Sequence, residues 1–236
     1  MRLGDSFPLE LKRSADLIRL GHFPDLMLDK HMADDITALW RTKSMQAVYQ
    51  RSAEFQLADS THYTMKNIHR FAESDYLPTF QDLLNLHART TVFTNFTFQC
   101  DNLTFTIVDI GGQRSERRKW LHFFPEVSLL AFVVAVSEYD MGLREDPKVK
   151  RMHESLMLFS DLFNGPWFKS CDIVLLLNKI DLFEAKIAQT DLNVCFPEYR
   201  GGKNYELALQ YIEGQFKRLV PVGINLLIHW VCALDA

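Results

Sequence analysis

The sequence predicts a mixed α/β protein whose N-terminal part is entirely helical. Two apolar runs of strand length, 129–136 and 173–177, are separated by a segment with apolar residues at helical spacing. This strand–helix–strand order is typical of a parallel sheet. By contrast, residues 1 to about 86 carry helical spacings and no convincing strand. With 47% hydrophobic residues in 236, the chain has enough apolar side chains for a core.

The N-terminal part, residues 1–86, is expected to form a small helical domain. Asp59 and Ser60 precede its last periodic segment, and residues of these types commonly cap a helix, so spacing alone predicts an ordinary N-cap. Pro24 and Pro78 interrupt the pattern. The helical spacings are Leu17, Ile18 and Leu20, then Ile36, Leu39 and Trp40, then Met65, Ile68 and Ala72.

The most informative stretch runs from Ile107 to Trp120. A strand predicted at Leu103–Val108, and expected to be buried, ends at Asp109, whose carboxylate could hold a metal ion through water. Gly111 and Gly112 would let backbone N–H groups approach a terminal phosphate. Gln113 could then orient a water for in-line attack, before a basic helix. For the two glycines alone, a hairpin turn is an equal alternative.

A second chemical motif follows the strand 173–177. The preceding run, 129–136, is continuously apolar, as expected of a strand buried on both faces. Asn178, Lys179 and Asp181 come directly after the second strand. An Asp carboxylate there can accept from the ring N–H and the amino group of guanine, and adenine does not offer this pair of donors. Asn and Lys would stabilise the loop and contact the face of the ring. The alternative is an ordinary turn at the end of a strand.

These motifs, in this order, resemble those of the alpha subunits of heterotrimeric G proteins. Residues 107–120 are similar to switch II, and residues 178–181 are similar to the guanine-specificity motif. The resemblance implies a Ras-like P-loop NTPase-type sheet over residues 87–236 with an all-helical domain at its N-terminal side, residues 1–86. It further implies a guanine-nucleotide-binding GTPase that works with GTP or GDP and Mg²⁺. Such a protein transduces signals from G-protein-coupled receptors with a beta-gamma dimer.

The resemblance also implies roles for single residues. Gln113 would position the attacking water, and Gly112 would sense the γ-phosphate. Thr90 and Asp109 would serve the magnesium, Asp109 through water. From the residues alone, Thr90 could instead be a β-branched residue leading into a strand at Phe93–Phe98.

The nucleotide would be held by Asn178, Lys179, Asp181 and the backbone of Ala233, with Asp59 and Ser60 facing it across an interdomain cleft. The surface offered to beta-gamma would comprise Arg117, Arg118, Lys119 and Trp120.

The departures from the family pattern bear on activity. His87 stands where the family has its catalytic arginine, and Val92 replaces a glycine. An arginine there contributes about 10³ to 10⁵ in rate, so hydrolysis is expected to be slow. The sequence contains no Gly-x-x-x-x-Gly-Lys-Ser/Thr P-loop, and the receptor-contacting C-terminal helix is missing. An incomplete sheet is therefore expected, with the central first strand missing between 103–108 and 129–136.

An alternative function is a non-catalytic interaction module, a fragment or decayed homologue that binds beta-gamma or effector enzymes without GTP turnover. A net charge of −4 argues against nucleic-acid binding. No transmembrane segment, signal peptide or myristoylation site is evident, so the expected location is the cytoplasm, at the inner face of the plasma membrane through partners. The four cysteines are widely spaced, which favours reduced thiols over disulfides or zinc.

Overall fold

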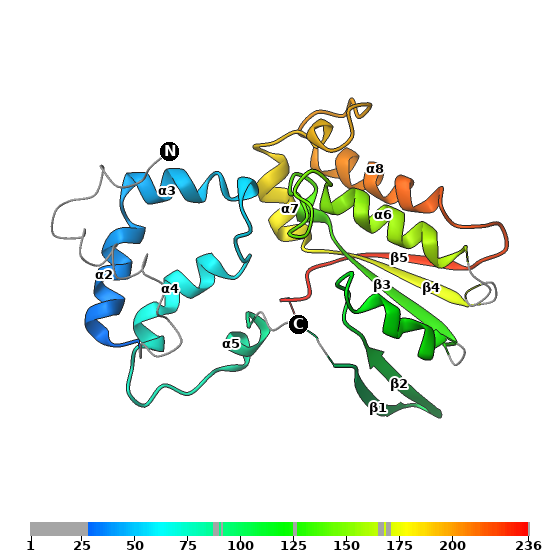
Figure 1. The fold of residues 1–236 in the computed structure, drawn as a ribbon, viewed down its shortest axis with the longest axis horizontal. Helices are drawn as coiled ribbons and strands as arrows, with labels where there is room; N and C mark the ends of the chain where they lie inside the picture. The colour runs from blue at the N-terminus through cyan, green and yellow to red at the C-terminus, as the bar shows by residue number, and fades with distance from the viewer. Residues whose placement is uncertain are drawn as a thin grey trace. The chain divides into compact units, whose positions relative to one another are not determined.

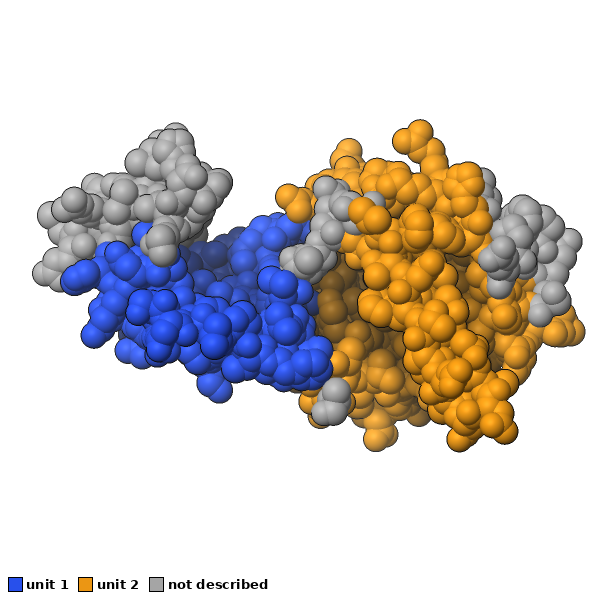
Figure 2. Space-filling model, turned by 90° about the horizontal axis from the view of Figure 1, so that it is seen from below, with its two compact units in different colours: residues 1–87 blue, residues 88–236 orange. Residues whose placement is uncertain are grey.

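The computed structural model describes residues 28–86, 90, 92–124, 127–164, 168 and 171–235. The chain divides into two compact units, residues 1–87 and 88–236, which are coloured separately in Figure 2. The helical spacing predicted at Leu17, Ile18 and Leu20 lies outside the described residues, and so does His87.

The described part of the first unit is helical, as its sequence predicts. Its elements are α2 (Lys30–Trp40), α3 (Lys43–Tyr49), the 3-10 helix η3 (Ser52–Glu54), α4 (Thr61–Phe71) and α5 (Phe80–Leu84) (Figure 1). The start of α2 is stabilised by the Asp29 side chain, which accepts from the Met32 N–H at 2.8 Å. Helices α2 and α4 pack together, and Ala33, Leu39 and Ile68 are buried.

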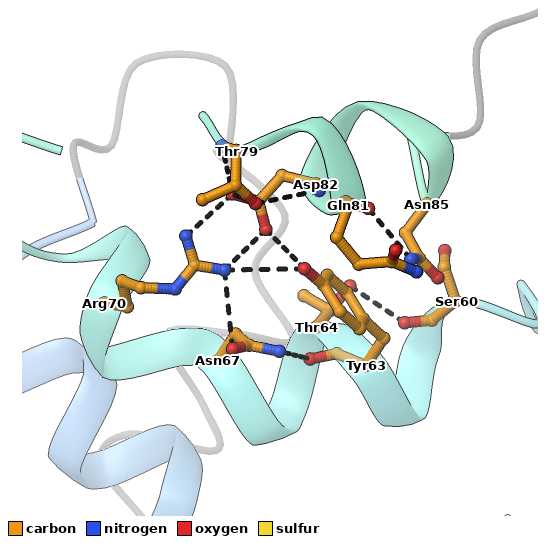
Figure 3. A network of polar contacts seen from close by, with 9 residues as sticks. All are labelled: Ser60, Tyr63, Thr64, Asn67, Arg70, Thr79, Gln81, Asp82 and Asn85. Carbon is orange, nitrogen blue, oxygen red and sulfur yellow. Dashed lines mark hydrogen bonds and ion pairs between the residues drawn. The ribbon is translucent and has the colours of Figure 1, made fainter. Parts of the chain in front are cut away.

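A polar network holds α5 against α4 (Figure 3). Arg70 donates to both carboxylate oxygens of Asp82 at 2.7 and 2.5 Å, and the Tyr63 hydroxyl donates to the same group at 2.6 Å. Asp82 also completes a capping box with Thr79. The bond from Arg70, together with those from Tyr63 and Thr79, holds the pKa of the Asp82 carboxyl well below its ordinary value. Side-chain contacts therefore stabilise a helix too short to be stable alone.

The second unit contains two separate sheets among its described residues. Strands β1 (Thr94–Cys100) and β2 (Leu103–Asp109) form an antiparallel hairpin. Strands β3 (Leu129–Ala135), β4 (Asp172–Asn178) and β5 (Leu226–Val231) form a parallel sheet in that order, which confirms the predicted mixed α/β class. The other elements are η4 (Arg117–His122), η6 (Val136–Glu138), α6 (Arg151–Leu162), α7 (Ile180–Ile187), η7 (Leu192–Val194) and α8 (Tyr205–Lys217).

The core of this unit lies between the parallel sheet and helices α6 and α8 (Figure 1). Phe132 of β3 contacts Phe159 of α6 and Phe216 of α8, with ring centroids 5.0 and 6.4 Å apart. Alternate residues of β4, Ile173, Leu175 and Leu177, are fully buried on this side. The middle strand is thereby anchored along its whole length, up to the residues that follow it.

Two predictions about burial are wrong. Strand β3 is not buried on both faces, because Leu129 and Val133 remain 50% and 58% exposed on the side away from α6 and α8. Strand β2 is exposed at every position instead of being buried. Its only described partner strand is β1, so β2 and β3 belong to separate sheets and each has an unpaired edge among the described residues.

The predicted basic helix after Gly112 exists as the 3-10 helix η4. Strand β5 ends at Val231, and the chain turns after it, where the Asp235 N–H donates to the Cys232 carbonyl at 3.1 Å. All four cysteines are free, with Cys171 and Cys195 buried and Cys100 exposed.

Candidate functional site

The carboxyl ends of β4 and β5 meet at one edge of the parallel sheet. Asn178, the last residue of β4, lies opposite Val231 in the strand register. Its side-chain oxygen accepts from the Lys179 N–H at 2.7 Å and from the Ala233 N–H at 3.0 Å. One amide side chain thus joins two segments that are 55 residues apart, and the structure brings together Asn178, Lys179 and Ala233.

Lys179 is held in place by a residue that the sequence did not single out. It has a left-handed backbone, with φ of 65°, directly before α7. Its ammonium donates to Glu138 at 3.0 Å, and Arg151 contacts the other oxygen of that carboxylate at 2.8 Å. Burial raises the pKa of the Glu138 carboxyl, but the charges of Lys179 and Arg151 outweigh it, and the pKa lies below its ordinary value. Glu138 therefore orients the lysine as a charged pair.

Asp181 lies in the first turn of α7, where its side chain meets the segment after β5. Burial raises the pKa of the Cys232 thiol, and a hydrogen bond to the Asp181 carboxylate raises it further. We call the group Asn178, Lys179, Asp181, Cys232 and Ala233 the β4–β5 corner. It gathers a carboxylate, an amide and an ammonium at one edge of the sheet.

The segment after β2 is organised around Gly111. A Cβ atom added to Gly111 would lie 2.6 Å from the Thr90 carbonyl oxygen, so only glycine fits there without displacing backbone. A Cβ at Gly112 would meet nothing within 4 Å, so that glycine is not required by packing. The structure thus places Thr90 against Gly111, two residues after Asp109. These are the two segments predicted to serve a metal ion.

The buried carboxylate of Glu154, on α6, anchors the same segment. Arg114 donates to Glu154 at 2.9 and 2.5 Å, and Arg117 lies 2.8 Å from it, while Glu154 itself is only 4% exposed. The hydrogen bonds from Arg114, and then those from Arg117, hold the pKa of Glu154 below its ordinary value despite burial. Arg117 and Trp120 also donate to the carbonyls of Gly112 and Gly111, at 3.3 and 2.9 Å. We call residues 111–120 the Glu154-anchored segment.

The four residues predicted to form a partner surface do not share one environment. Arg117 points inward to Glu154, and Trp120 is half-buried against the core. Arg118 and Lys119 are exposed, and Lys119 forms an ion pair with Glu116. Gln113 is half-buried, and its carbonyl accepts from the Glu116 N–H at 2.9 Å. Of these four residues, Arg118 and Lys119 are therefore the exposed basic ones.

Asp59 and Ser60 belong to the first unit. Ser60 occupies the N-cap position of α4, but its side chain makes no capping hydrogen bond. Its carbonyl oxygen instead accepts from the Thr64 hydroxyl at 3.0 Å (Figure 3). Ser60 therefore lies at the predicted N-cap position, but its side chain does not make the hydrogen bond of an ordinary N-cap.

The described residues contain no group of three His, Cys, Asp or Glu side chains that could hold a metal ion. Thr90 and Asp109 offer one hydroxyl and one carboxylate. Magnesium typically takes one or two protein oxygens and completes its shell with water and phosphate oxygens. The two residues therefore fit a magnesium ion that arrives with a nucleotide, and do not fit a metal held by protein alone.

A family model described as G-protein alpha subunit matches residues 6–236. The chain belongs to the G-protein alpha subunit family. G-alpha proteins are GTPases that bind Mg²⁺-GTP and work with a beta-gamma dimer and receptors, so membership implies a G-alpha-like role and a Ras-like fold for this chain. Among the described residues of this G-alpha chain, no helix has the length and apolarity needed to cross a membrane.

Proposed function

We propose that this chain is a G-alpha-like guanine-nucleotide-binding protein that transduces receptor signals with a beta-gamma dimer. The observation that carries the proposal is the β4–β5 corner, where Asn178 joins the loop after β4 to Ala233 and Asp181 lies beside Cys232. Asp181 would accept from the ring N–H and amino group of guanine. Lys179, oriented by Glu138, would lie along the base. The Ala233 N–H would donate to the guanine oxygen. It would then give up its present hydrogen bond to the Asn178 side chain.

Base exchange is the sharpest test of this proposal. Asp181→Asn should lose guanine nucleotide and gain xanthine nucleotide, because xanthine carries an oxygen in place of the amino group that the carboxylate would accept from. Loss of a charge-assisted pair of hydrogen bonds corresponds to about 10²-fold in affinity. The measurement is fluorescent GDP and XDP titration of the purified chain. Asp172→Asn, at the opposite end of the same strand, is the matched control and should change neither affinity.

Binding of neither nucleotide by the unmodified chain would contradict the proposal. So would an equal loss of GDP affinity in the Asp172→Asn control, which would indicate damage to the strand.

For the phosphate end we propose the roles that the motifs suggest. Thr90 and Asp109 would serve the magnesium ion, which when bound neutralises phosphate charge, while Gly112 would sense the γ-phosphate. Gln113 would orient the attacking water. Turnover is proposed to be slow, because a histidine at position 87 is shorter than an arginine and lacks the permanent charge of a guanidinium. Single-turnover hydrolysis in His87→Arg should be faster than in the original chain, and an unchanged rate would argue against this explanation.

The alternative is an interaction module that binds beta-gamma or effector enzymes without turnover. The Glu154-anchored segment favours it, because contacts with Glu154 hold the segment to α6 and leave Arg118 and Lys119 exposed. A pull-down with beta-gamma, with and without GTP, separates the two functions. Release by GTP supports the transducer, whereas equal capture in both conditions supports the module. Arg118→Ala should weaken capture in either case.

Domain assignment and location follow from the proposed role. We propose that residues 1–86 are the helical domain, with Asp59 and Ser60 facing the nucleotide, and that residues 87–236 are the GTPase domain. We propose further that the protein acts at the inner face of the plasma membrane, to which its partners would bring it.

A further inference from the structure

Residues 138–140 follow β3 and contact α7 at both of its ends. Glu138 pairs with Lys179, directly before the helix, with the ammonium nitrogen and a carboxylate oxygen 3.0 Å apart. Asp140 pairs in the same way with Lys186, in the last turn of the helix, at 2.8 Å. The two acids therefore hold opposite ends of the helix that begins at the β4–β5 corner.

The residue between the two acids fixes the middle of α7. Tyr139 is fully buried, and its ring meets the ring of Phe183 edge-on, with the centroids 5.6 Å apart. The Tyr139 hydroxyl donates to the Thr190 carbonyl, beyond the end of the helix. Phe183 and Ile187 are themselves buried in the core. Packing therefore sets the body of α7, whereas the ion pair of Glu138 acts on its first turn.

The first turn of α7 needs support from outside the helix, because the chain enters it in an unfavourable conformation. Lys179 is the N-cap residue, and its φ of 65° is a left-handed angle that is costly for a residue with a Cβ atom. Such a conformation persists where the surrounding contacts determine it. Here Asn178 accepts from the Lys179 N–H, and Glu138 accepts from the Lys179 ammonium. Lys179 is thus held at both its backbone and its side chain.

We propose that Glu138 is a positioning residue for base selectivity that acts through Lys179 on Asp181, an inference that rests on the proposed guanine site. Asp181 follows Lys179 by two residues, so a change in the Lys179 backbone angles would tilt the first turn and move the carboxylate. Acceptance from both the ring N–H and the amino group of guanine requires two aligned bonds, and hydrogen bonds weaken steeply when bent. Hypoxanthine has the ring N–H but lacks the amino group. Misalignment of Asp181 should therefore reduce the preference for guanine over hypoxanthine.

The charge on Glu138 is what this role requires. Its side chain is 18% exposed and lies between two cations, Lys179 and Arg151, which contact different carboxylate oxygens. An amide in its place has a single oxygen acceptor, and its NH₂ group would point donors at one of the cations. Glu138→Gln therefore weakens the hold on Lys179 while keeping the side-chain volume. Glu138→Asp keeps the charge on a stem one methylene shorter and should retain part of the function.

The experiment measures base preference, as the ratio of the dissociation constants for inosine diphosphate and GDP, by competition against fluorescent GDP. In Glu138→Gln the preference for GDP should fall about three- to tenfold, the equivalent of one hydrogen bond. Glu138→Asp should lie between Glu138→Gln and the original chain, and it provides the test if Glu138→Gln does not fold.

Asp140→Asn is the matched control, because it removes a charge from the ion pair at the other end of the same helix. Urea unfolding should show a loss of stability in both Asp140→Asn and Glu138→Gln. The preference for GDP in Asp140→Asn should nevertheless stay within about twofold of the original value. A residue that only stabilises α7 would not separate these two measurements.

Hydrogen exchange without nucleotide provides a second measurement. The Phe183 N–H donates to the Lys179 carbonyl at 3.0 Å and so reports on the first turn of α7. Its exchange should accelerate in Glu138→Gln and stay unchanged in Asp140→Asn.

The outcomes separate this inference from the proposed function. If the original chain binds GDP and the Glu138 variants keep its base preference, the inference is overturned and the proposed function stands. Binding of neither nucleotide by the original chain would overturn both. An equal loss of preference in Asp140→Asn would assign the effect to the general stability of α7 and overturn the inference. Unchanged exchange at Phe183 in Glu138→Gln would overturn it as well.

Discussion

The β4–β5 corner and the Glu154-anchored segment, which we propose as the two ends of a nucleotide site, are stabilised differently. The corner extends from a strand whose alternate side chains are fully buried. The Glu154-anchored segment extends from a strand that is exposed at every position, and a single buried carboxylate holds it to α6. The proposed base-binding corner is therefore supported by the sheet itself, whereas the proposed phosphate-binding segment depends on ion pairs.

The largest expected contrast is in core packing. Leu175→Ala, in the middle of β4, should lower the free energy of unfolding by about 2–5 kcal/mol, because it creates a cavity under the corner. Phe96→Ala, in the exposed hairpin, should change it by about 0.5 kcal/mol or less in dilute protein. Urea unfolding followed by circular dichroism measures both. Equal losses would mean that the hairpin is as well packed as the sheet, and the comparison would fail.

The next largest expected effect tests the ion pairs of Glu154, which hold residues 111–120 to α6. Glu154→Gln keeps the side-chain shape but removes the charge that Arg114 and Arg117 share, which should cost roughly 1–2 kcal/mol because both arginines remain partly solvated. Hydrogen exchange should accelerate in residues 111–120 and stay unchanged in 178–181. Glu184→Gln, at an exposed position on α7, is the control. Faster exchange at the corner would show that the two ends are not independent.

A smaller effect appears in acid. The pKa of Glu154 is lower in the folded chain than its ordinary value of 4.5, so its stabilising contribution is complete above that pH. The contribution decreases as pH falls through the lower folded-state value. The difference in unfolding free energy between the original chain and Glu154→Gln should therefore be largest near pH 6 and shrink below pH 4.5. A difference independent of pH would exclude the ion pairs as its cause.

The smallest expected effect tests the contact between Asp181 and Cys232 in the β4–β5 corner. Asp181→Asn removes the carboxylate that adds to the effect of burial on the Cys232 thiol, so the pKa of Cys232 should fall. Alkylation of Cys232 at pH 8 should accelerate, by less than about tenfold, because burial persists. Cys100, exposed in the same chain, serves as the internal reference. An unchanged ratio of the two rates would indicate that Asp181 and Cys232 are not in contact.

The sequence predicts those parts of the fold that depend on local patterns. The strand ahead of Asn178 and the helix between it and the run 129–136 were identifiable from an apolar run and from periodicity, and they exist as β4 and α6. The exposure of β2 and of one face of β3 could not be predicted from the sequence. An apolar run indicates that a strand can be buried, but it does not indicate which elements pack against that strand. Pairing between distant strands determines that, and no local pattern encodes it.

The anchoring residues of the site were missed for a similar reason. Glu154 lies off the apolar stripe of α6, where a charged residue usually faces water, so its burial by two arginines left no signal in the spacing. Glu138 follows a strand in a run of mixed residues, and only the fold places it beside Lys179. The motif residues themselves were identifiable because their chemistry is concentrated in consecutive positions.

Asp82 combines two tasks in one carboxylate, since it closes the capping box of α5 and also receives Arg70 and Tyr63. No substitution there can separate the start of that helix from its attachment to α4. Even glutamate, one methylene longer, would have to satisfy a cap and an ion pair whose geometries were matched to the shorter side chain. When position 82 is replaced by every other residue type, we therefore expect that aspartate alone is tolerated and that no substitution gives an intermediate stability.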